Sequence, residues 1–76
     1  MDINEFVSYF AEQFEETDST LFTPQTNFRN NDEWSSLTAL TIIAMVDEKY
    51  SVKLTGDDLR KSVTIEDVFN IVNTKK

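Results

Sequence analysis

The fold is decided by residues 36–50, which read SLTALTIIAMVDEKY. Apolar side chains recur there at helical spacing and form one core-facing stripe, made of Ala39, Ile42, Ile43, Val46 and Tyr50. Further apolar residues extend the apolar surface of this helix beyond the single face that a bundle buries, namely Leu37, Leu40, Ala44 and Met45. This stretch therefore predicts a helix over residues 36–50 with a second apolar face, on which another molecule docks.

A second amphipathic pattern precedes this helix. Five apolar residues fall on one helical stripe and predict a helix over about residues 3–16, capped by Asp2: Ile3, Phe6, Val7, Phe10 and Phe14. Residues 17–34 show no period and are rich in turn-forming side chains, which predicts a long loop. Loops of this length are usually functional. We expect three apolar side chains to anchor it to the core, those of Leu21, Phe22 and Phe28.

The C-terminal third predicts two more helices after an extended connector at residues 50–54. Thr55 and Thr64 are each followed three residues later by an acid, the pattern that starts a helix. These signals predict a short helix over about residues 56–61 and a longer one over about residues 65–73. The chain is therefore expected to be a single domain over residues 1–76, with an all-α fold: a small bundle of three longer helices and one short helix.

Composition excludes several classes of function. The chain has 14 acidic and 7 basic side chains, a net charge of -7, which opposes binding to nucleic acid. It has no Cys and no His, which excludes disulfides, thiolate or imidazole metal sites and Ser–His or Cys–His nucleophiles. We therefore expect no catalytic residues and no metal site. No apolar stretch is long enough for membrane insertion, and a monomeric cytoplasmic protein is expected.

Three stretches carry a resemblance to a known family: Trp34-Ser35-Ser36-Leu37, YSVKLTGDDL at residues 50–59, and TIEDV at residues 64–68. Together they resemble the acyl carrier protein family of phosphopantetheine-binding carrier proteins, along nearly the whole chain and without a gap. The resemblance implies an acyl-carrier-protein-like fold and a 4′-phosphopantetheine arm, taken from coenzyme A, on Ser36. It further implies that the arm carries acyl intermediates as thioesters in fatty-acid, polyketide or related lipid biosynthesis, and that the chain itself is not an enzyme.

The chain departs from the family pattern at the serine itself. Family members place Asp before the modified Ser, whereas this chain has Ser35, so Ser35 stays a second candidate for the attachment point. Leu37, directly after Ser36, favours Ser36. A helix N-terminus stabilises phosphate charge, and this helix has Thr38 or Ala39 in its first turn where the other predicted helices have an acid. A phosphate on Ser36 would supply the missing anion.

The resemblance also implies partners, namely a phosphopantetheinyl transferase and acyl-ACP synthases, dehydratases, reductases or acyltransferases. Thr38 and Thr41 stand where family members have acids that bind basic patches, which predicts dedicated partners. The residues expected to contact partners are Trp34, Leu37, Thr38, Thr41, Met45, Asp47 and Glu48. Trp34 fits packing within the loop equally well.

Two alternatives to an acyl carrier remain open. A carrier of aminoacyl or D-alanyl groups would need the same arm, and composition does not separate the cargoes. A carrier-like interaction module that is never modified, and that binds its partner through residues 36–50, would explain the loss of Asp before Ser36.

Overall fold

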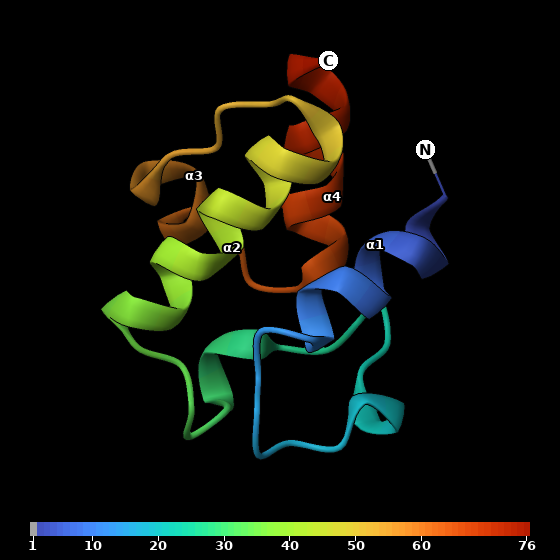
Figure 1. Cartoon of the computed structure of the whole chain (residues 1–76), viewed down its shortest axis with the longest axis vertical. Coiled ribbons are helices and arrows are strands. Elements are labelled where there is room, and N and C mark those ends of the chain that lie inside the picture. The colour runs from blue at the N-terminus through green and yellow to red at the C-terminus, as the bar shows by residue number, and fades with distance from the viewer. Residues whose placement is uncertain (1) are drawn as a thin grey trace.

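The computed structural model describes residues 2–76, and Figure 1 shows their path through four α-helices. Helix α1 spans Ile3–Ala11, α2 spans Ser36–Tyr50, α3 spans Gly56–Arg60 and α4 spans Ile65–Lys75. Within residues 2–76 there is no strand, and the one β-type pairing is an isolated bridge between Asn27 and Thr64. The predicted small all-α bundle is thereby confirmed.

Each helix is preceded by an N-cap residue whose side chain accepts a backbone N–H from the first turn, and these caps are Asp2, Ser35, Thr55 and Thr64. Thr55 and Thr64 form complete capping boxes, in which Asp58 and Asp67 accept a hydrogen bond from the N–H of the capping residue. Helix α3 ends one residue before the predicted Lys61, which is its C-cap.

Helix α4 continues to Lys75, beyond the predicted end at residue 73. The Lys75 ammonium holds this last turn in place, because it lies 2.8 Å from Asp58 Oδ2 and donates to the Lys53 carbonyl at 3.1 Å. A cation at this end of a helix also opposes the negative end of its dipole.

The prediction that the first helix reaches residue 16 is wrong, because α1 ends at Ala11. The N–H groups of Gln13 and Phe14 bond to carbonyls only three residues earlier, so the chain tightens and leaves the helix. Acids at residues 12, 15 and 16 would also face the negative end of the helix dipole. Phe14 nevertheless stays buried and stacks on Phe10, with ring centroids 5.9 Å apart.

The connection from α1 to α2 is a loop with two short 3₁₀ turns, Ser19–Leu21 and Phe28–Asn30. Phe22 and Phe28 anchor it as expected, with exposed fractions of 8% and 0%. Leu21 does not, because it is 69% exposed. Neighbouring residues point to different sides of a turn, so burying Phe22 leaves Leu21 in solvent.

Backbone hydrogen bonds fasten this loop to the start of α4. The N–H of Ile65 donates to the Thr26 carbonyl at 3.2 Å, and the N–H of Glu66 donates to the Pro24 carbonyl at 2.9 Å. Helix N-termini leave such N–H groups without an intrahelical partner. The loop therefore satisfies two donors of α4 and is held in a fixed position.

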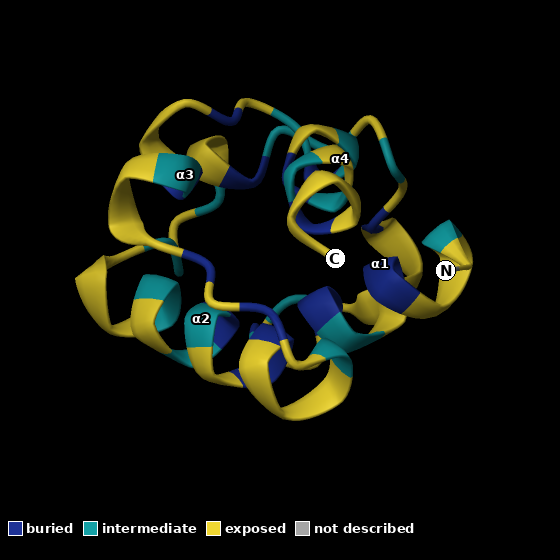
Figure 2. Cartoon of the chain, turned by 90° about the horizontal axis from the view of Figure 1, so that it is seen from above, coloured by how far each residue is buried: buried dark blue, intermediate teal, exposed yellow. Residues whose placement is uncertain are grey.

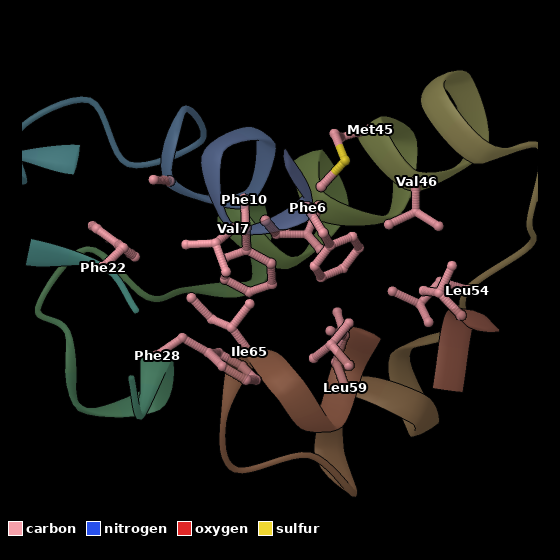
Figure 3. Close-up of a cluster of buried hydrophobic side chains, with 14 of the residues drawn as sticks. Phe6, Val7, Phe10, Phe22, Phe28, Met45, Val46, Leu54, Leu59 and Ile65 are labelled. Atoms are coloured by element: carbon pink, nitrogen blue, oxygen red, sulfur yellow. The ribbon is translucent and has the colours of Figure 1, made fainter. Parts of the chain in front are cut away.

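The core lies where the four helices face one another. Figure 3 shows its side chains converging from α1, α2, α3, α4 and the loop, and Figure 2 shows the exposed residues on the outer sides of the helices. Phe6, Phe10 and Phe28 are completely buried. The connector predicted at residues 50–54 begins one residue later, because Tyr50 still belongs to α2 and Ser51 ends that helix in the left-handed region. Residues 51–55 join α2 to α3, and Val52 and Leu54 within them are buried.

Candidate functional site

The N-terminus of α2 uses Ser35 as its cap. Ser35 has an extended backbone, and its Oγ accepts the N–H of Thr38 at 3.3 Å and lies 3.3 Å from Thr38 Oγ1. The Thr38 hydroxyl in turn donates to the Glu33 carbonyl at 2.7 Å. The Ser35 hydroxyl is therefore engaged in starting the helix.

Ser36 is the first helical residue of α2, and it is exposed. Across the described residues its hydroxyl takes part in no hydrogen bond, so a group attached there would displace nothing. The first turn of α2 contains no acid, whereas those of the other three helices do. Ser36 therefore lies beside helical N–H groups whose positive charge no side-chain carboxylate of its own turn offsets.

An open groove of about 490 Å³ runs between α2 and α3, beginning at the two serines. Its apolar lining comes from the loop, α2 and α3, and consists of Trp34, Ala39, Leu40, Ile43 and Leu59. Gly56 and the side chains of Arg29 and Arg60 complete it. The Ser36 hydroxyl thus lies at one end of a mainly apolar groove that also carries two cationic side chains.

Arg29 connects the loop to the end of α3. Its Nη1 donates to the carbonyl of Arg60 at 2.8 Å and to the carbonyl of Ser62 at 3.3 Å. Arg60 forms an ion pair with Asp57 one turn earlier in the chain. Arg29 and Arg60 are the chain's only arginines. Sequence reasoning missed this pair, because the two residues come together only through the fold.

The opposite side of α2 is acidic. A furrow of about 360 Å³ between α2 and the segment that follows α1 is lined by Gln13, Glu15, Glu16, Glu33, Ser35, Leu37, Thr38 and Thr41. Glu33 is fixed there, since its Oε1 accepts the N–H of Glu16 at 2.6 Å and the Thr17 hydroxyl at 3.4 Å. Three acids from outside α2 therefore flank Thr38 and Thr41.

The residues predicted to contact partners that lie on α2 differ in exposure. Leu37 is 71% exposed, and Asp47 and Glu48 are exposed at the other end of α2. Thr38 and Thr41 are half-buried, and the Thr41 hydroxyl donates to the Thr38 carbonyl at 2.7 Å. Asp47 pairs with Lys53 at 2.7 Å, so it presents a partly neutralised charge. Leu37, Asp47 and Glu48 thus lie on the outer face of α2, with Thr38 and Thr41 at its edge beside the furrow.

Met45 was predicted to lie on that surface, and the structure instead places it in the core. It is buried, and Figure 3 shows it in the same cluster as Phe6. Helix α1 packs against α2, which covers this side of the helix. Helical periodicity alone does not show which of two apolar faces a neighbouring helix covers.

Trp34 packs within the loop, as one of its two predicted roles requires. Its ring packs edge-on against Phe28, with centroids 4.7 Å apart, and stacks on Phe14 at 6.4 Å. It is half-buried and also lines the groove beside Ser36. Trp34 is thus a loop-packing residue with one side turned toward the site.

The residues at this site fit a phosphodiester-linked prosthetic group. The N–H groups of the first turn of α2 that Ser35 does not accept and the guanidinium groups of Arg29 and Arg60 could bind a phosphate, and the Ser36 hydroxyl oxygen would be the atom bonded to its phosphorus. No protein-family model, no curated protein and no solved structure matches the chain. None of the described helices is both long and apolar enough to cross a membrane.

Proposed function

We propose that this chain is a carrier protein that holds acyl groups on a phosphopantetheine arm attached to Ser36. The observation that supports this proposal best is that the two serines have different hydrogen-bonding roles. Ser35 Oγ caps α2, while Ser36 Oγ is exposed and unengaged at the head of an apolar groove. The motif resemblance supports the same residue.

The arm supplies a thiol that forms thioesters, and the chain's own residues bind and orient it. The first-turn N–H groups of α2 stabilise the phosphate charge at Ser36. The groove offers apolar contacts from Ile43, Leu59 and Trp34 that shield a bound chain from water. The acid-free first turn of α2 removes a source of repulsion for that phosphate.

The proposal includes two kinds of partner. A phosphopantetheinyl transferase would modify Ser36, and acyl-processing enzymes would bind the outer face of α2. Leu37 on this face and Leu40 at the edge of the α2–α3 groove are exposed by 71% and 61%, which gives a partner two apolar contacts. The flanking acids Glu15, Glu16 and Glu33 would favour a partner with a basic surface.

The same exposed leucines support a second candidate function, an unmodified interaction module. Such a module would bind its partner through α2 and would need no hydroxyl at residue 36. Ser36→Ala would then leave its binding unchanged, whereas a carrier would lose its arm.

The test is the intact mass of the purified protein after incubation with coenzyme A and a broad-specificity transferase. We expect one arm to be added to the wild type and to Ser35→Ala, and none to Ser36→Ala. Fragmentation of the modified protein should place the added mass on Ser36. Failure of several transferases to modify the folded wild type would refute the carrier and favour the unmodified module, and an adduct on Ser35 would refute the assignment of the site.

A further inference from the structure

The two sides of α2 differ in charge, and Ser36 opens onto the positive side. Arg29, Arg60 and Ser36 all line the α2–α3 groove. The furrow on the other side is lined by carboxylates and does not include Ser36; its acids are Glu15, Glu16 and Glu33. An anion attached to Ser36 is therefore attracted toward the groove and repelled from the furrow.

Arg29 is positioned by the main chain and has no carboxylate partner within the described residues. The carbonyls of Arg60 and Ser62 occupy its Nη1, at 2.8 and 3.3 Å, and both are uncharged. Its Nε and Nη2 remain as further donors, and within the described range no carboxylate forms an ion pair with it. Arg29 is thus a fixed guanidinium with free donors in a chain of net charge -7.

Arg60 lies at the same groove and is only loosely engaged. Its Nη2 pairs with Asp57, and both side chains are about 70% exposed, at 70% and 71%. Exposed pairs of this kind contribute little free energy, so exchange of one anion for another is nearly neutral. Its Nη1 lies 3.7 Å from where a Cβ on Gly56 would stand, which places the guanidinium over a residue that lines the groove.

We propose that Arg29 and Arg60 bind the phosphodiester of the arm on Ser36 and direct the arm into the α2–α3 groove. This inference rests on the proposed attachment at Ser36. Planar guanidinium groups match pairs of phosphate oxygens and form charge-assisted hydrogen bonds with them. The part of the arm next to the phosphate, which carries two geminal methyl groups, would then lie against Ile43 and Leu59 and away from Leu37.

The test measures where the arm lies in the modified protein. Isotope-filtered NMR on ¹³C-labelled protein with an unlabelled arm detects nuclear Overhauser effects (NOEs) from the geminal methyl protons to Ile43 and Leu59. The variants are Arg60→Gln and the double variant Arg29→Gln/Arg60→Gln. Lys61→Gln is the matched control, because it removes the same charge from an exposed neighbour that does not line the groove.

We expect each lost arginine to lower the ratio of docked to undocked arm by about 1.5- to 5-fold, the range for exposed charge pairs. The Lys61→Gln control should keep the wild-type NOEs. Asp57→Asn should strengthen them, because it frees Arg60 from its carboxylate. Added salt should weaken docking in the wild type and have little effect on the double variant.

Arg29→Gln also removes two bonds to main-chain carbonyls, so circular dichroism must show that the double variant is folded. If the double variant does not fold, Arg60→Gln alone still tests the inference, because this side chain is 70% exposed and its removal should not disturb the fold. Unchanged NOEs in both folded arginine variants, or wild-type NOEs to Leu37 and Thr38, would overturn the inference while leaving the carrier function intact. No mass gain in the wild type would instead refute attachment and, with it, the carrier function.

Discussion

Replacing Phe28 by Leu should test whether this side chain anchors the long loop that precedes the site. Phe28 is completely buried, and its ring lies 5.2 Å from that of Phe10 and 4.7 Å from that of Trp34. Each aromatic pair contributes about 0.5–1.5 kcal/mol beyond its buried area. Leucine removes both pairs but keeps an apolar side chain, so we expect a loss of about 2 kcal/mol in the free energy of unfolding.

That loss is large for a chain of this size. At about 0.05–0.15 kcal/mol per residue, the 76 residues give a total stability of about 4–11 kcal/mol. A loss of about 2 kcal/mol should lower Tm by about 8–16 °C. Phe28→Ala would cost about 3–5 kcal/mol and could leave little folded protein, which makes leucine the better substitution.

Leu21→Ala is the matched control, because it shortens a side chain in the same loop that is 69% exposed. Its cost should stay under about 1 kcal/mol, since little of its apolar area leaves water on folding. Urea unfolding followed by circular dichroism and by the fluorescence of Trp34, the only tryptophan, measures both variants. Equal losses in the two variants would show that Phe28 does not hold the loop.

Three further predictions concern caps and charges. Ser35→Ala should lower stability by about 1 kcal/mol through loss of the N-cap, whereas Ser36→Ala should leave Tm nearly unchanged; the reverse order in thermal unfolding would refute the assigned roles. Ser51→Gly should raise stability by about 0.5–1 kcal/mol in urea, because Ser51 ends α2 in the left-handed region at φ 57°. Hydrogen bonds from the backbone N–H groups of Thr64 and Val63 lower the pKa of Asp67 below its usual 3.8, and a hydrogen bond from Lys75 is the main cause that lowers the pKa of Asp58. The two ionised carboxylates stabilise the fold fully above the ordinary Asp pKa, and this contribution is lost as pH falls through their lower pKa values in the folded protein. Asp67→Asn should therefore flatten the decline in Tm below pH 4, and an unchanged slope would contradict this.

The local signals in the sequence predicted the helix starts well. The caps at Thr55 and Thr64 depend on residues three positions apart, and the start of α2 follows from Ser35 and the apolar run behind it. The end of α1 was not predictable in this way. Phe14 keeps the helical spacing of the stripe, and only the observed 3₁₀ bonds show that the chain has already left the helix.

In the candidate site, too, local features were predicted from the sequence and long-range contacts were not. Ser36 was expected at the head of α2 and lies there, because a helix start is a local feature. The groove and its arginines were not expected, since Arg29 and Arg60 are 31 positions apart and meet only when the loop docks beside α3. The burial of Met45 likewise depends on where α1 packs.

Because the loop is hydrogen-bonded to the start of α4, amide exchange at the start of α4 depends on whether the loop is in place. The amide hydrogens of Ile65 and Glu66 are bonded to the carbonyls of Thr26 and Pro24, and both bonds break if the loop lifts away. Hydrogen exchange at these two amides would therefore follow local opening of a segment that precedes them by two helices. The same loop carries Trp34 and Arg29, so these exchange rates also indicate how often the groove beside Ser36 loses one of its walls.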